Sequence, residues 1–292
     1  MDLAVTAAPV RDAARPRVAT LAIYATGIGL SSFLLFAVEP LVGRLALPVF
    51  GGVPSAWATV LAFFQGVLLL GYLYGHLSVT RLGLRRGALV HVAVAVVAFA
   101  LLLGAPADWA TLRNTAIPPG PNLLAILAVA VGPPAFLLTA TTPLLSAWYA
   151  GVRDAETPGA VDPYWLYALS NGASLAALLA YPFVIEPLLG LAAQRTTWAA
   201  AIGIFVLLVA AGAWRVRRTV TAGPAPAIAA APGEAEDARD EHAVTGRRRL
   251  RWFVLAAIPS GLLTAVTTFI ATDLVSAPLL WVGPLALYLA SF

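Results

Sequence analysis

The sequence predicts an all-α protein, a polytopic bundle of transmembrane helices, and three observations support this fold class. Of the 292 residues, 60% are hydrophobic and only 11% are charged, and the mean hydropathy is +0.86. Soluble globular domains carry roughly twice that share of charge. The apolar residues fall into runs of about 20, the length that crosses the hydrocarbon core of a bilayer. The basic residues, all of them arginine, lie mostly between these runs.

The apolar runs define seven full spans and one partial span, bounded by Pro, Gly and charge clusters. The full spans cover residues 18–38, 55–77, 87–103, 122–148, 164–185, 197–214 and 252–272, and the partial span starts at residue 278. The first run is too long for a signal peptide and lacks a small-residue cleavage site, which indicates a retained helix. The fourth run contains Pro133, Pro134 and Pro143, so we expect a kink there.

The arginines predict the orientation of these spans. If the N-terminus is cytoplasmic, only Arg44, Arg113 and Arg195 of the 18 arginines lie outside, which is the asymmetry that the positive-inside rule describes. We therefore expect a multi-pass protein of the plasma membrane, surrounded by the lipid bilayer, with its N-terminus in the cytoplasm. The basic pI of about 9.8 then follows from membrane topology, and nucleic acid is not expected as a partner.

This layout divides the chain into a cytoplasmic tail at 1–17, a six-helix transmembrane bundle at 18–214, a cytoplasmic linker at 215–251 and the start of a second bundle at 252–292. The linker is rich in Ala, Pro and Gly around an acidic cluster from Glu234 to Glu241, a composition typical of disorder. The last apolar run has about 15 residues, too few to span, so we expect a truncated second bundle. Six spans, a charged cytoplasmic loop and further spans are the layout of major facilitator transporters.

The loop GHLSVTRLGLRRG, from Gly75 to Gly87, resembles the loop at the same place in many facilitators but lacks its usual acidic residue. Its arginines equally satisfy the positive-inside rule, so this loop alone does not decide the family. Longer phrases carry a more specific resemblance. They include LPVFGGVPSAW from Leu47, TATTPLLSAWY from Thr139, PYWLYALSNGASLAALLAYPFVIEPLLGL from Pro163 and IPSGLLTAVTTFIATDLVSAPLLW from Ile258.

With these phrases the chain resembles the membrane portion of bacterial fused proteins that join a major-facilitator-like bundle to a spermidine-synthase-like domain. The resemblance implies a facilitator-like fold in the bacterial inner membrane. It also implies, as partner, an aminopropyltransferase-like domain or chain that binds an S-adenosylmethionine-type donor. The near match to a glycine-rich nucleotide turn, GIGLSS from Gly27 to Ser32, lies inside an apolar helix, where small residues allow close helix packing. No cofactor, metal or catalytic group is therefore expected in this chain.

Five polar residues at membrane depth are candidates for a solute pathway: Glu39, Gln65, Asn171, Glu186 and Asp273. Glu39 and Glu186 occur in nearly repeated words, FAVEP and FVIEP, each at the predicted outer end of a helix. They are either interfacial carboxylates where a proline ends the helix, or an anionic pair at the outer mouth that receives a cation. Glu186 is the better candidate, because its word belongs to one of the longer phrases. Arg44 is expected to neutralise one of the two.

The other polar positions also have two interpretations each. Gln65 lies mid-span, either as packing glue or in the pathway, and the same helix has glycines that indicate close packing on a neighbour: Gly66, Gly71 and Gly75. Asn171 shares a polar stripe with Ser170 and Ser174, and Asp273 follows a threonine-rich helix. His76 and His91 are expected at the level of the lipid headgroups, and with no other His in the bundle a metal site is not expected.

Three classes of function remain open on this sequence. The chain is a transporter-like bundle for a small solute, with a cationic amine such as a polyamine as one option. Alternatively it is a membrane anchor for an aminopropyltransferase-like domain or chain. The third class is a structural membrane component without transport. Catalysis by this chain alone is not expected, because no nucleophile, metal cluster or paired acid and base is assembled in the sequence.

Overall fold

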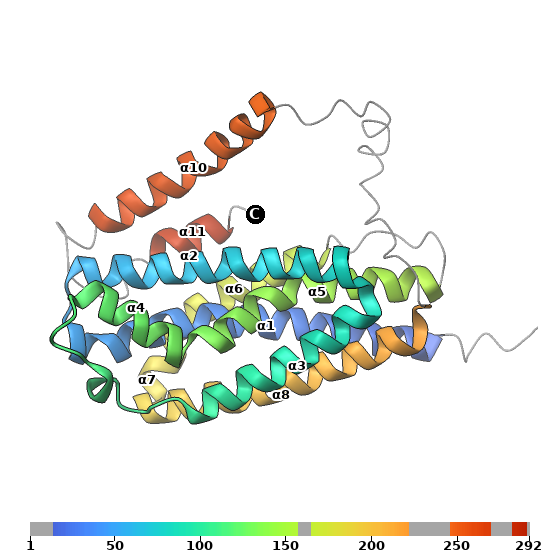
Figure 1. Cartoon of the computed structure of the whole chain (residues 1–292), viewed down its shortest axis with the longest axis horizontal. Helices are drawn as coiled ribbons and strands as arrows, with labels where there is room; N and C mark the ends of the chain where they lie inside the picture. Colours follow the sequence, from blue (N-terminus) through green and yellow to red (C-terminus); the bar gives the residue numbers. More distant parts are fainter. Residues whose placement is uncertain (1–13, 157–164, 222–245, 270–281, 291–292) are drawn as a thin grey trace, which may run out of the picture.

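The computed structural model describes residues 14–156, 165–221, 246–269 and 282–290, and every regular element in these ranges is a helix (Figure 1). The longer helices are α1 (Ala14–Phe50), α2 (Pro54–Leu77), α3 (Gly83–Gly104), α4 (Pro119–Ala130), α5 (Gly132–Glu156), α6 (Trp165–Ala180), α8 (Leu191–Thr219), α10 (Gly246–Phe269) and α11 (Val282–Ala290). Short elements are η1 (Ser78–Leu82), η2 (Trp109–Leu112), η3 (Tyr181–Ile185) and α7 (Glu186–Leu188).

Six helical stretches are long and apolar enough to cross a membrane: Val18–Phe50, Ser55–Gly104, Gly132–Glu156, Trp165–Leu188, Leu191–Thr219 and Gly246–Val266. They overlap all seven predicted full spans: Ser55–Gly104 contains both α2 and α3, while Gly132–Glu156 contains only the second part of span 122–148 and Gly246–Val266 only the first part of span 252–272. The predicted all-α membrane bundle is therefore confirmed. The ends of the predicted linker are helical, since α8 extends to Thr219 and α10 begins at Gly246. Residues 222–245 lie outside the described ranges.

Helix α1 continues through Pro40 and Pro48 and ends at Phe50. Of the two interpretations of Glu39, the one in which Pro40 ends the first helix is therefore wrong. Proline removes one backbone hydrogen bond, but in a membrane the neighbouring helices hold such a helix together, and Pro40 is buried against them. The helix stops instead at Gly51, whose φ of 76° suits glycine and whose N–H donates to the Leu47 carbonyl at 2.9 Å.

The predicted fourth span is two helices, α4 and α5, that meet at Val131. Pro133 and Pro134 follow directly, and neither has an N–H for the carbonyl one turn earlier. The expected kink is therefore confirmed at this place. Pro143 lies inside α5 without ending it. Helices α2 and α3 form an antiparallel hairpin through η1, where Gly83 has a φ of 70° (Figure 1).

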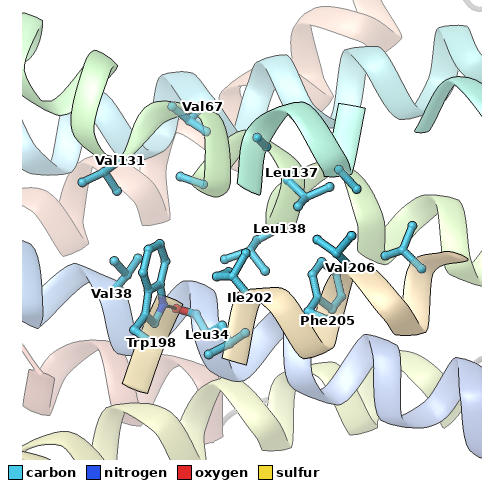
Figure 2. Packing of buried hydrophobic residues seen from close by; sticks show 14 of the residues in the cluster. Leu34, Val38, Val67, Val131, Leu137, Leu138, Trp198, Ile202, Phe205 and Val206 are labelled. Atoms are coloured by element: carbon cyan, nitrogen blue, oxygen red, sulfur yellow. Dashed lines mark hydrogen bonds between the residues drawn. The ribbon is translucent and has the colours of Figure 1, made fainter. Parts of the chain in front are cut away.

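Helices α1 and α5 form the centre of the bundle. Helix α1 packs on α5, α6 and α8, while α5 packs on α1, α2, α3 and α8. Figure 2 shows part of the core between them, where the Trp198 indole Nε1–H donates to the Leu34 carbonyl at 3.0 Å. The nearby Phe205 and Ile202 of α8 are completely buried. Because the core joins residues from α1, α2, α3, α4, α5, α6 and α8, the first six predicted spans form one packed unit.

Glycines of α2 allow close contact with α5. A Cβ atom at Gly71 would overlap the Thr139 hydroxyl and lie 2.9 Å from the Ala140 backbone nitrogen. At Gly75 it would lie 3.3 Å from Pro143. The prediction that this helix packs closely on a neighbour is confirmed for these two positions. It is wrong for Gly66, which is exposed and has no described atom within 4 Å of an added Cβ.

Helix α11 packs on the side of the bundle where α6 lies. Its Leu289 is buried against Leu178 of α6, and Phe36, Trp57 and Leu175 pack around this pair. These residues belong to α1, α2 and α6, so α11 covers a surface to which all three helices contribute. We call this surface the α11 face. The described side chains of α10, in contrast, are exposed.

Candidate functional site

The α11 face is where the polar candidates of α1 and α6 lie. On α1 a stripe at helical spacing contains Ser32, Phe36, Glu39 and Gly43. Ser32 shares a hydrogen bond of 2.7 Å with the Ser170 hydroxyl of α6. Phe36 packs in the cluster around α11. A Cβ at Gly43 would lie 2.6 Å from the Trp57 ring of α2. The stripe thus faces α6, α11 and α2.

Glu39 lies in the middle of this stripe, one turn from Phe36. Its side chain is partly buried. Among the residues that the structure describes, its carboxylate has neither a hydrogen bond nor an ion pair. A carboxylate at this depth needs a counter-charge, a proton or water to offset its desolvation. Glu39 is therefore the described candidate whose charge the bundle itself leaves uncompensated.

Asn171 lies beside Ser170 on α6 and is also partly buried. The predicted polar stripe is real: Ser170 bonds to Ser32 of α1, and the Ser174 hydroxyl donates to the Ser170 carbonyl at 3.0 Å. Asn171 is one turn from Leu175, which packs in the cluster around α11. Its amide makes no hydrogen bond to any other described residue, so both its carbonyl oxygen and its NH₂ group are available.

Gln65 is exposed on α2. It lies two turns before Tyr72 on the same side of the helix. Tyr72 is about half exposed on this side of α2, as is Tyr167 on α6. The expected role of Gln65 as packing glue has no support within the described ranges, because its side chain contacts no neighbouring helix by hydrogen bonding.

The rise of an α-helix gives the spacing of these groups along the bundle. Ser32 and Ser170 are at the same level, because their hydroxyls are bonded. Glu39 is seven residues further along α1, which corresponds to about 10 Å. Asn171 adjoins Ser170.

Glu186 has a different environment from Glu39, although the two share their local sequence. Its carboxylate forms an ion pair with Arg44 of α1, and the two side chains are 26% and 39% exposed. The expectation that Arg44 neutralises one of the two glutamates is confirmed. Glu186 opens α7, which ends two residues later at Leu188, so here the glutamate–proline word does mark the end of a helix. The ion pair between Arg44 and Glu186 thus connects α7 to α1.

A buried bridge next to this ion pair was not anticipated from the sequence. The Tyr181 hydroxyl donates to the Gln194 Oε1 at 2.8 Å, and the Gln194 Nε2 donates to the Leu189 carbonyl at 2.8 Å. Both side chains are nearly completely buried. The bridge fixes the turn between α7 and α8 and leaves neither side chain free for a ligand. Its only sequence signal is a polar residue, Gln194, near the start of an otherwise apolar run.

His91 is completely buried among the helices, whereas His76 is exposed; the place of both at the level of the lipid headgroups stays a prediction. Helix α3 begins at Gly83, which puts His91 about 12 Å from the start of the helix. The Nε2 atom of His91 is 2.9 Å from the Thr141 hydroxyl of α5. A signal in the sequence was available, because His91 shares a 3–4 periodic stripe with three small residues that are also buried: Ala88, Ala95 and Ala98.

Asp273, the fifth candidate, lies outside the described residues. Within the described ranges no group of three or more His, Cys, Asp or Glu residues is placed to hold a metal ion. Glu39 and Asn171, the two partly buried candidates without a hydrogen bond among the described residues, lie on α1 and α6, which pack against each other. Glu186 is separate and paired.

The length and hydropathy of the helices define the class: the chain is a multi-pass, helical membrane protein. Comparison of the chain with protein-family models, with curated proteins and with solved structures finds no match.

Proposed function

We propose that the chain forms part of a facilitator-like transporter that binds a small cationic solute, an organic amine of the polyamine class, on the α11 face. The observation that carries the proposal is Glu39, a partly buried carboxylate without a hydrogen bond or ion pair among the described residues. The similar Glu186 is compensated by Arg44. A protonated amine would supply at Glu39 the positive charge that Arg44 supplies at Glu186.

The other groups on the α11 face suit such a solute. Carbonyl oxygens of Asn171 and Gln65 accept hydrogen bonds from ammonium groups. The rings of Tyr72 and Tyr167 attract cations through their π-systems. A linear polyamine alternates charged nitrogens with methylene segments, and the α11 face likewise alternates polar residues with apolar ones such as Phe36 and Leu175.

The place of this surface in the bundle also supports the proposal. Transporters built from two bundles bind their solutes between the bundles, near the middle of the membrane. Helix α11 belongs to the segment that follows the linker, and it covers the face that carries Glu39 and Asn171. This agrees with the facilitator-like layout and with the resemblance to spermidine-synthase-like fusion proteins. With the predicted cytoplasmic N-terminus, Glu39 would lie in the outer half of the membrane.

The test is uptake of radiolabelled putrescine and spermidine by liposomes that contain the purified chain. Replacing Glu39 by Gln keeps the size of the side chain and removes its charge, so E39Q is expected to lose at least about tenfold in uptake, the equivalent of 1.4 kcal/mol of interaction. The matched control is E186Q, which removes the other glutamate of the repeated word and is expected to keep most of the uptake.

Two results would contradict the proposal. One is the absence of amine uptake by the wild-type chain under conditions in which it remains folded. The other is equal uptake by E39Q and wild type. After either result, the next function to test would be the anchoring of an aminopropyltransferase-like partner. That function rests on the resemblance alone, and co-purification would test it.

A further inference from the structure

Four buried side-chain groups lie where α2, η1, α3 and α5 pack. They are the Tyr74 hydroxyl, the Ser78 hydroxyl, the His91 Nδ1 and the Trp148 Nε1. The Tyr74 and Ser78 hydroxyls are close enough to interact with each other, and neither the His91 Nδ1 nor the Trp148 Nε1 has a hydrogen-bond partner among the described residues. His91 and Trp148 are completely buried and Ser78 is 3% exposed. Buried polar groups in a protein core usually have hydrogen-bond partners. Unpaired groups that lie close together therefore indicate a partner that they share.

The four groups lie close to one another. The ring centroid of His91 is 5.7 Å from that of Tyr74 and 5.8 Å from that of Trp148. Ser78 is one helical turn after Tyr74 and packs against Gly87, where an added Cβ would lie 2.7 Å from the Ser78 hydroxyl. Gly87 in turn is one turn before His91 on α3. Ser78 therefore lies next to Tyr74, Tyr74 next to His91, and His91 next to Trp148.

The contacts of Thr141 determine the tautomer of His91. The Thr141 hydroxyl has one proton, and it donates this proton to the Leu137 carbonyl one turn earlier on α5. It can then only accept from the His91 Nε2, which lies 2.9 Å away and must carry the hydrogen. In a neutral imidazole with hydrogen on Nε2, the Nδ1 is a bare acceptor.

The missing partner must therefore both donate and accept. The His91 Nδ1 accepts only, the Trp148 Nε1–H donates only, and the two hydroxyl groups do either. All four groups are neutral in these forms, so they do not select an ion. The smallest molecule with both properties is water, and buried waters in proteins typically make about three hydrogen bonds to such otherwise unsatisfied groups.

We propose that these four groups form a binding site for water inside the helix bundle. A bound water donates to the His91 Nδ1 and accepts from the Trp148 Nε1–H, and the Tyr74 and Ser78 hydroxyls complete its hydrogen bonds or hold a second water. The site is distinct from the α11 face, and it does not depend on the transport of any solute.

Histidine-selective ¹⁵N labelling tests the tautomer and the bound partner together. The chain has three histidines, so a solid-state spectrum of the protein in lipid contains three sets of signals, and H91Q identifies the set of His91. We expect a neutral ring with hydrogen on Nε2 and an Nδ1 shift typical of a hydrogen-bonded acceptor, with a cross-peak to water protons. Hydrogen on Nδ1, or an Nδ1 shift typical of an acceptor without a bond, would overturn the proposal.

A second measurement does not depend on any variant. Radiolytic hydroxyl labelling modifies buried side chains that contact bound water. Trp148 is expected to be oxidised several-fold faster than Trp198, its matched control, which is also buried but donates its Nε1–H to the Leu34 carbonyl. Equally slow oxidation of both tryptophans would overturn the proposal.

Discussion

At the scale of single residues, Glu39 and Glu186 show how the same local sequence acquires two different chemical states. Each glutamate precedes a proline and follows an apolar run. Arg44 bonds to Glu186, which is 142 positions away in the chain, and not to Glu39, which is five positions away. The charge of Glu186 therefore serves to join α1 and α7. That of Glu39 remains available to a ligand.

The ion pair between Arg44 and Glu186 gives a prediction about stability. Because both side chains are partly exposed, solvent screens their attraction, and we expect a coupling free energy of about 0.5–1 kcal/mol. The measurement is a double-mutant cycle with R44Q, E186Q and the double variant, followed by thermal unfolding in detergent. Arg195, whose guanidinium bonds to the Ala107 carbonyl, supplies the control variant R195Q, which should not couple to E186Q. Strictly additive effects of R44Q and E186Q would contradict the prediction.

At the scale of helices, hydropathy predicted where the spans lie, because the need for about 20 apolar residues is a property of composition. It predicted the ends of the helices less well. In one interpretation Pro40 ends α1, yet α1 packs against α5, α6 and α8 and continues ten residues further, to Phe50. Pro133 and Pro134 do break a helix, since two consecutive residues lack an N–H. A helix can continue through a single proline when neighbouring helices pack against it, and the sequence alone does not show which helices these are.

The contact of α2 with α5 gives a prediction at this scale. Replacing Gly71 by Ala places a methyl group against the Thr139 hydroxyl and the Ala140 backbone. Backbone cannot move aside as a flexible side chain can, so we expect destabilisation by about 1–3 kcal/mol, typical of an overpacked core. The matched control is G66A in the same helix, where the added methyl has no described neighbour within 4 Å.

G66A is expected to be neutral or slightly stabilising, because alanine is the better helix former by up to about 1 kcal/mol. Thermal unfolding of both variants in detergent, followed by circular dichroism, compares them directly. Similar stabilities for G71A and G66A would contradict the close packing of α2 on α5.

At the scale of the whole molecule, the sequence predicted a multi-pass helical bundle and several of its polar residues, but not which residues meet. The α11 face combines residues from α1, α2, α6 and α11 that are far apart in the chain. Its composition depends on the rotation of each helix about its axis, which neighbouring helices determine. His91 is the clearest case, because nothing in the sequence pairs it with Thr141, 50 residues away.

The orientation of the bundle in the membrane is testable because the chain has no cysteine, so that every introduced thiol reports on one site. Thr115 is exposed between α3 and α4, and Thr80 is exposed between α2 and α3. From the arginine asymmetry we expect T115C to react in intact cells with a maleimide that does not cross membranes. T80C should react only after the membrane is permeabilised, and the reverse pattern would contradict the predicted orientation.

The close approach of α2 and α5 at Gly71 also has a mechanical consequence. Moving α2 along α5 by one helical turn would, in one direction, bring Val67, on the same side of the helix as Gly71, against Thr139 and the Ala140 backbone. The close contact at Gly71 therefore limits how far α2 can slide along α5 in that direction. If the proposed transport takes place, we expect the movement that exposes the site alternately to the two sides of the membrane at other helix contacts.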